Sequence, residues 1–228
     1  MKVLALDTAT EACSVALEID GRVLERYVEL ERGHAERLLP MVDDVLTEGG
    51  IALGALDAIA FGRGPGGFTG VRLAAGVVQG LAFGAGLGVV PISNLAAVAQ
   101  RAADLAPEAR RVLVVNDARM REVYWAEFAA AGAVTPLGAE QVTAAATVAF
   151  SSDAAHLQWV AAGRGLAAWP ELADRCRARG AVVLDSLLPR AREILALAIP
   201  TVAAGQALPP EQALPVYVRE RVAEAATS

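Results

Sequence analysis

Residues 62–72, with the sequence GRGPGGFTGVR, decide how the rest of this chain is interpreted. They hold five glycines, one proline and two arginines in eleven positions. Glycine at this density marks backbone conformations that other residues avoid, or backbone that another group approaches closely. The apolar run at 58–61 predicts a buried strand before the segment, and the pattern at 69–83 predicts a helix after it. A strand, a glycine-rich turn and a helix can present backbone N–H groups to a phosphate.

Two known phosphate-binding motifs do not fit this loop. Gly62, Gly64 and Gly67 satisfy G-x-G-x-x-G, but no Asp or Glu occurs between positions 58 and 103 to bind the ribose of a dinucleotide. A P-loop needs lysine before the Ser/Thr, and here Phe68 stands in that place. A phosphate-binding loop without a diagnostic motif and a tight structural turn both remain open, and the turn is favoured. The candidate loop residues are Gly62, Arg63, Gly64, Pro65, Gly66, Gly67 and Thr69.

The predicted helix carries glycine at every fourth position. Gly76, Gly80 and Gly84 therefore lie on one face, and that face lets another helix approach its backbone closely. Each glycine in a helix costs about 1 kcal/mol relative to alanine, so three on one stripe indicate a packing demand. The neighbour is either another part of this fold or a partner protein, and the sequence alone leaves both open.

Composition restricts the class of protein. The 228 residues are 55% hydrophobic and 20% charged, which predicts a folded chain with one large domain or two small lobes. The net charge of −6 argues against direct binding of nucleic acid. Cys13 and Cys176 form no CxxC motif, which favours a reducing compartment. The N-terminus has no signal-peptide pattern, so we expect a cytoplasmic protein.

One stretch, residues 73–92, has the length and apolar composition of a membrane span. Gln79 is its only polar side chain. Its repeated glycines, followed by Pro91, favour a helix, a turn and a strand instead. We therefore expect no membrane-spanning segment.

The chain divides into two similar halves. Residues 1–105 and 106–228 are the expected lobes, with Ala106-Pro107-Glu108 as linker. Each half begins with a buried strand, an acidic turn and a second strand, VLALDTAT with CSVALEI and then VLVVNDARM with EVYWAEF. Asp20-Gly21 is the predicted hairpin turn between the second and third strands, and Ser93 is the predicted cap of the helix at 93–103. Periodicity predicts strands at 2–7, 13–19, 23–30, 58–61, 88–92, 112–116, 121–128, 159–162 and 181–184, and helices at 38–46, 69–83, 93–103, 166–178 and 187–198.

Asp7 and Asp117 each end a predicted strand. In a two-lobed kinase-like fold such acids contact phosphate or Mg²⁺, but a turn or helix-capping aspartate is the favoured interpretation of each residue taken alone. His34 and His156 are 122 positions apart and belong to no metal-binding motif, so we expect no metal site. Neither cysteine has a histidine nearby and no G-x-S-x-G occurs, so no nucleophilic catalyst is expected.

Six segments together resemble the TsaB (YeaZ) family of tRNA threonylcarbamoyladenosine biosynthesis proteins. The similarity extends from residue 1 to about residue 220. The loop segment and the DAR…EVYW block are the most specific of the six. The six segments are LALDTATEACSVAL (4–17), HAERLLPMVDDVL (34–46), FGRGPGGFTGVRLAAGVVQGLA (61–82), DARMREVYWAE (117–127), GRGLAAWPEL (163–172) and LPVYVRE (214–220).

This resemblance implies an α/β, two-lobed actin-like (ASKHA, ribonuclease H-like) fold of two duplicated domains, with the C-terminal segment packing back on the first lobe. It implies a non-catalytic subunit that binds and activates TsaD in threonylcarbamoylation of N6 of adenosine 37, in tRNAs that read ANN codons. TsaE is the other implied partner. A second copy of this chain takes the place of TsaD when TsaD is absent, forming a homodimer. Contact with tRNA is implied only within the complex. The metal-binding HxxxH of TsaD has no counterpart at 93–103.

The resemblance also assigns residues. Asp7, Thr8 and Asp117 keep phosphate-loop positions as vestigial nucleotide contacts, and no cofactor is expected except ATP or ADP within the complex. Arg121 departs from the small residue of relatives and adds charge at the cleft. An ATP-dependent phosphotransferase is the alternative function. The implied contacts to TsaD or a second copy are Leu38, Met41, Val42, Val45, Arg72, Ala75, Gly76, Gln79, Gly80 and Phe83.

Overall fold

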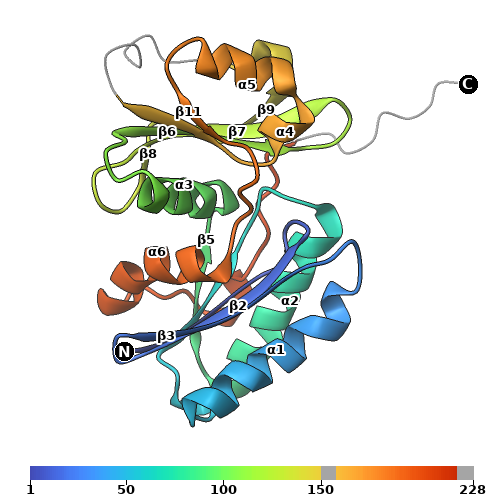
Figure 1. The fold of residues 1–228 in the computed structure, drawn as a ribbon. Helices are drawn as coiled ribbons and strands as arrows, with labels where there is room; N and C mark the ends of the chain where they lie inside the picture. The colour runs from blue at the N-terminus through green and yellow to red at the C-terminus, as the bar shows by residue number, and fades with distance from the viewer. Residues whose placement is uncertain (150–157, 220–228) are drawn as a thin grey trace, which may run out of the picture.

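The computed structural model describes residues 1–149 and 158–219, and its first sheet has five strands in the order β3-β2-β1-β4-β5 (Figure 1). Its first three strands form an antiparallel meander, whereas β1, β4 and β5 run parallel. The turn between β2 and β3 is the predicted Asp20-Gly21, with both residues at positive φ. The strands are β1 (Lys2–Asp7), β2 (Ala12–Ile19), β3 (Arg22–Glu29), β4 (Ala58–Gly62) and β5 (Gly88–Ile92).

The second sheet repeats this topology. Its order is β11-β10-β6-β7-β8, and β9 also pairs with β7. Again an antiparallel pair, β6 with β7, stands beside parallel strands β10 and β11. The duplicated two-lobed α/β fold is therefore confirmed. The strands are β6 (Arg111–Asp117), β7 (Glu122–Ala129), β8 (Thr135–Pro136), β9 (Gln141–Ala144), β10 (Trp159–Ala162) and β11 (Val182–Leu184).

Helices cover both faces of each sheet, and α3 and α6 lie between the two sheets (Figure 1). α1 and α2 pack together on the outer face of the first sheet, and α5 packs on the outer face of the second. The inner faces are covered by α6 and α3, which also contact each other. The helices are α1 (His34–Gly49), α2 (Phe68–Ala85), α3 (Asn94–Leu105), α4 (Gly165–Ala168), α5 (Pro170–Arg177) and α6 (Ala191–Ala203).

Two helices pack on the sheet of the opposite half. α3 precedes the boundary expected at residue 105, yet it contacts β6, β7 and β10. α6 follows that boundary and contacts β1, β2, β4 and β5. Beyond α6, Leu208 bridges Val89, and Ala213 is buried with the first core. We call β1–β5 with α1, α2 and α6 the first lobe, and β6–β11 with α3, α4 and α5 the second lobe.

Prolines account for the main differences in helix boundaries. The helix expected at 166–178 is divided at Trp169, because this residue before Pro170 leaves the helical conformation (φ −129°, ψ 76°) and Pro170 starts a new helix. The helix expected at 187–198 begins only at Ala191, after Pro189. Conversely, α1 begins at His34 and accommodates Pro40 in its interior.

Residues 73–92 divide as the glycines predict. α2 ends at Ala85, Gly86 adopts φ 66°, and β5 follows. By length and composition alone α2 is apolar enough to cross a membrane, and only 28% of it is buried. Its buried side packs on the first sheet, so much of an apolar helix is left facing outward.

His156, one of the two histidines considered as metal ligands, lies outside the described residues.

Candidate functional site

The glycine loop is packed against the end of β1. A Cβ on Gly62 would meet Asp7 Oδ1 at 2.1 Å, and one on Gly70 would meet the carbonyl oxygen of Thr8 at 1.9 Å. The Thr8 hydroxyl donates to the carbonyl oxygen of Gly70 at 2.7 Å. Glycine is required here because backbone and side chains of the β1 end occupy the space of a side chain.

Three backbone N–H groups of the loop are engaged within the protein. Gly67 donates to the carbonyl oxygen of Ala9 at 2.7 Å, and Gly64 donates to Asn94 Oδ1 at 2.7 Å. The N–H of Arg63 bonds the carbonyl oxygen of Ile92. These three groups are not free for a phosphate, which supports a structural turn over a phosphate-binding loop.

The two arginines of the loop both have interaction partners within the protein, Arg63 with Glu140 and Arg72 with Phe68. Arg63 makes a two-pronged ion pair with Glu140 of the second lobe, at 3.2 and 3.3 Å. The Ser93 hydroxyl also bonds Glu140, while Ser93 Oγ caps α3 by accepting from two backbone N–H groups. Arg63 therefore links the loop to the second lobe, as a structural residue in the described chain.

Asp7 is buried completely at the junction of the lobes. Asn94 Nδ2 donates to Asp7 Oδ1 at 2.6 Å, while Asp7 Oδ2 has no hydrogen-bond partner among the described residues. Burial raises the pKa of Asp7 from its ordinary 3.8 to about 7, against hydrogen bonds from Asn94 and the backbone of Ala9 and Thr8 that lower it. This acid is positioned to connect β1 with α3.

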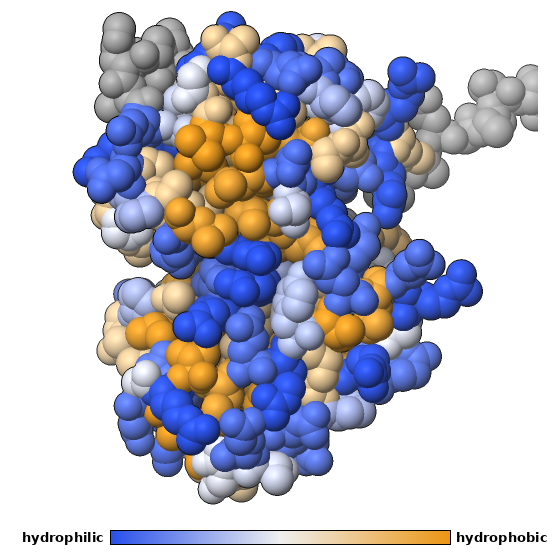
Figure 2. Space-filling model, in the orientation of Figure 1, coloured by the Kyte–Doolittle hydropathy of each residue, from blue (hydrophilic) through white to orange (hydrophobic). Residues whose placement is uncertain are grey.

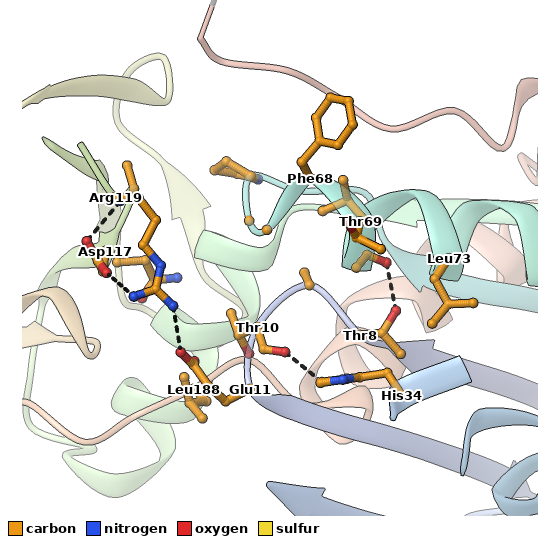
Figure 3. Close-up of a pocket in the computed structure, with 18 of the residues that line it drawn as sticks. Thr8, Thr10, Glu11, His34, Phe68, Thr69, Leu73, Asp117, Arg119 and Leu188 are labelled. Atoms are coloured by element: carbon orange, nitrogen blue, oxygen red, sulfur yellow. Dashed lines mark hydrogen bonds and ion pairs between the residues drawn. The ribbon is translucent and has the colours of Figure 1, made fainter. Parts of the chain in front are cut away.

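A cleft of about 780 Å³ opens between the lobes. Figure 3 shows Asp117 and Glu11 on either side of Arg119. Arg119 ion-pairs with Asp117 at 3.3 Å and reaches across to Glu11 at 3.4 Å. Below them His34 Nε2 bonds the carbonyl oxygen of Thr10 at 2.9 Å. Thr8 and Asp117 line this cleft, whereas Asp7 lies outside its lining.

The counterpart of Asp7 in the second lobe is Asn116. A Cβ on Gly163 would meet Asn116 Oδ1 at 2.7 Å, which matches the contact between Gly62 and Asp7 in the first lobe. Asn116 is 5% exposed and lines the cleft, and neither atom of its amide has a partner among the described residues. The residue predicted from the sequence was the neighbouring Asp117. Aligning LALD with LVVN would have identified Asn116.

The arginine predicted to charge the cleft is not the one that lines it. Arg119, Met120 and Arg121 all adopt positive φ in the turn between β6 and β7, at 61°, 52° and 64°. This turn directs Arg119 into the cleft and leaves Arg121 exposed outside its lining. The placement of Arg121 at the cleft is therefore wrong, because the direction of a side chain reverses along so tight a turn.

The glycine stripe of α2 faces outward. A Cβ on Gly76, Gly80 or Gly84 would have nothing within 4 Å. Packing inside the described fold therefore does not explain the stripe. Phe83 beside it is 79% exposed. Figure 2 shows an apolar patch on the lower lobe, on the side where α2 lies in Figure 1.

An aromatic cluster continues this surface at the start of α2. The guanidinium carbon of Arg72 lies 3.2 Å from the centre of the Phe68 ring and 4.7 Å from that of Tyr217. The rings are themselves 6.3 Å apart, and Phe68 and Tyr217 are 54% and 47% exposed. Arg72 thus stacks on aromatic rings at the surface.

Five of the ten expected partner contacts lie inside the first lobe. At most 8% of each is exposed, because they fill the core between α1, α2 and the sheet. The prediction that these side chains form the binding surface is wrong. Arg72, Gly76, Gly80 and Phe83 are exposed and Gln79 is half-buried, so their partner contacts stay predictions. The five buried residues are Leu38, Met41, Val42, Val45 and Ala75.

Comparisons with known proteins cover nearly the whole chain. The family model described as TsaD, tRNA N6-adenosine threonylcarbamoyltransferase, matches residues 28–207. The tRNA threonylcarbamoyladenosine biosynthesis protein TsaB of Escherichia coli K12 is 44% identical over 98% of this chain and 96% of its own. YeaZ from Pseudomonas aeruginosa has a TM-score of 0.85 at 49% identity, over 95% of this chain and 99% of that one. A second structure, described as similar to peptidase YeaZ from Pseudomonas aeruginosa, has a TM-score of 0.87.

Two duplicated α/β lobes joined around a cleft define a protein of the actin-like class. Within the described residues, no three His, Cys, Asp or Glu side chains gather where a metal ion would bind. The similarity in sequence and in structure extends over both lobes and through the glycine loop. The chain belongs to the TsaB (YeaZ) family of tRNA threonylcarbamoyladenosine biosynthesis proteins.

Proposed function

We propose that this chain is a non-catalytic subunit that binds and activates TsaD, for threonylcarbamoylation of N6 of adenosine 37 in tRNAs reading ANN codons. The observation that carries the proposal is the outward stripe of Gly76, Gly80 and Gly84, which nothing in the described chain covers. Such a stripe lets a partner helix approach the backbone of α2 closely. In a TsaB-family chain, TsaD is the partner we propose, and a second copy takes its place when TsaD is absent.

The state of the two acids supports a non-catalytic role. Asp7 is buried and bonded to Asn94, and Asp117 is ion-paired with Arg119. Asp7 is therefore closed to a metal–phosphate group, and Asp117, which lines the cleft, would have to give up its pair with Arg119 to hold one. We further propose that TsaE joins this assembly and that the chain contacts tRNA only as part of the assembly. We also propose that the chain needs no cofactor, apart from ATP or ADP within the complex, and that it acts in the cytoplasm.

The binding proposal is tested with leucine placed on the stripe. Gly76→Leu and Gly80→Leu put a bulky side chain where the partner must approach, so we expect more than about tenfold weaker binding of TsaD. The melting temperature should not fall, because leucine is a better helix former than glycine. Glu171→Leu, on an exposed position of α5, is the matched control and should bind as the wild type does. Undiminished binding by a folded Gly80→Leu would contradict the proposal.

The role in the reaction is tested by reconstitution. With TsaD, TsaE, this chain and threonylcarbamoyl-AMP as the group donor, modification of tRNA with release of AMP is expected, and omission of this chain should abolish it. The alternative, an ATP-dependent phosphotransferase, rests on the cleft and the unpartnered amide of Asn116. Titration calorimetry decides it, since micromolar ATP binding by the isolated chain, lost in Asp7→Ala, would favour the phosphotransferase.

A further inference from the structure

The chain crosses between the lobes a third time at residues 213–219, after the connections β5–α3 and β11–α6. Ala213 is 2% exposed and belongs to the core of the first lobe. The N–H of Val216 donates to the carbonyl oxygen of Arg63 at 2.8 Å. The Val216 carbonyl oxygen also lies 2.8 Å from where a Cβ on Gly64 would be, so the segment presses on the glycine loop.

Three residues later the same segment is attached to the second lobe. Arg219 Nη2 donates to the carbonyl oxygen of Ala118 at 3.2 Å and ion-pairs with Glu122 at the start of β7. The Arg219 side chain is only 18% exposed, so this anchor is partly shielded from solvent. Because three residues span at most about 10 Å, the lobes cannot separate far while both anchors hold.

Other ion pairs also cross between the lobes, among them Arg164 with Glu29 at 2.6 Å and the partly buried pair of Arg63 with Glu140. The pairs of Arg119 and Arg164 with Glu11 are exposed, at 3.4 and 3.8 Å, and salt screens such pairs. Residues 216–219 also form part of the cleft lining. Their release would therefore remove one restraint on the separation of the lobes and uncover part of the cleft, while the packing of α3 on α6 remains.

We propose that residues 213–219 are a strap that sets the separation of the lobes and couples it to the outward face of α2. Tyr217 supplies the coupling, because its ring lies beside Arg72 and Phe68 at the start of that helix. A partner that covers α2 would contact the strap at Tyr217. A shift of the strap would then move the glycine loop, to which Val216 is hydrogen-bonded, and the part of the cleft lining that the strap forms. The coupling, unlike the strap itself, rests on the proposed function.

The strap is tested on the full free chain with spin labels at Gln206→Cys and Glu171→Cys, one exposed position in each lobe. The native Cys13 and Cys176 are buried. Arg219→Ala should broaden and lengthen the distance distribution, and the Val216 amide should exchange its hydrogen about tenfold faster. Glu122→Gln removes the other half of the same ion pair and should act alike.

Arg110→Ala is the control, since this exposed arginine bonds only the nearby carbonyl oxygen of Pro107 among the described contacts. If Arg219→Ala and Glu122→Gln both match the control in distance and exchange, the strap is overturned. Adding TsaD should change the exchange of the 216–219 amides. If TsaD binds and those amides do not respond, the coupling is wrong and the proposed function stands. If TsaD does not bind at all, the proposed function fails, and the strap is judged on the free chain alone.

Discussion

Asp7 shows how one buried carboxyl changes the stability of a fold with pH. Its pKa is raised, so the folded chain holds this proton to about pH 7, whereas the unfolded chain releases it near 3.8. The folded state therefore binds more protons between these values. Its free energy of unfolding falls as pH rises through that window and is level above it.

Asp7→Asn removes this dependence while keeping an oxygen that accepts from Asn94. We expect the variant to be more stable than the wild type above pH 7, by on the order of a few kcal/mol, with the difference shrinking toward pH 4. Thermal unfolding at several pH values measures it. Asp43→Asn, on the exposed side of α1, is the control. A difference that is the same at every pH would contradict the assignment.

Glycines 70 and 76 provide a second test at single positions. Gly76→Ala adds a methyl in open space on an exposed helix, so it should stabilise the free chain by about 0.5–1 kcal/mol. Gly70→Ala drives the same methyl into the Thr8 carbonyl oxygen, so it should destabilise by about 1–3 kcal/mol or more. Denaturant unfolding of both variants measures the pair. Equal effects would show that the two glycines are not used differently.

At the scale of elements, hydrophobic periodicity located α1 and α2 but not what they contact. The stripe through Leu38 and Val45 looks the same in sequence whether a sheet or a partner covers it. In the structure the sheet covers it. α2 has only three polar side chains, Thr69, Arg72 and Gln79, so its sequence marks the outward side weakly and its packing is needed to identify it. Local signals did better, because the Ser93 cap and the Asp20-Gly21 turn depend on neighbouring residues alone.

Two adjacent leucines test the corrected orientation of α1. Leu38 is fully buried, so Leu38→Ala should cost about 2–5 kcal/mol of stability. Leu39 is 49% exposed, so Leu39→Ala should change stability by no more than about 0.5 kcal/mol. Urea unfolding of both variants checks this. The orientation is wrong if Leu39→Ala proves the more destabilising.

At the scale of the whole molecule, the duplication was visible in sequence, because both halves begin with the same strand pattern. The positions of α3 and α6 were not, since each packs on a sheet formed by the other half of the chain. Nothing in a helix of alanine, leucine and isoleucine specifies which of two similar apolar faces it will cover. The cleft residue Asn116 was missed for a different reason, because the acidic Asp117 stands out by its charge, whereas Asn116 is found only by aligning LALD with LVVN.

Dividing the chain at residue 105 provides the test at this scale. The fragment 1–105 lacks α6, so Val3, Ala5 and Ala60 would lose their cover. We expect it to bind a hydrophobic dye and to unfold without a cooperative transition. Mixing it with 106–228 should restore cooperative unfolding. A sharp thermal transition of 1–105 alone, near that of the full chain, would contradict this packing.

The position of α6 also determines the order of events on the ribosome. The first sheet can be complete after β5, but its inner face stays bare until residue 203 has been synthesised. A nascent chain therefore carries an exposed apolar sheet through the synthesis of roughly the second half of the protein. Chaperones that bind exposed apolar segments should meet this chain early and leave it only when α6 has docked.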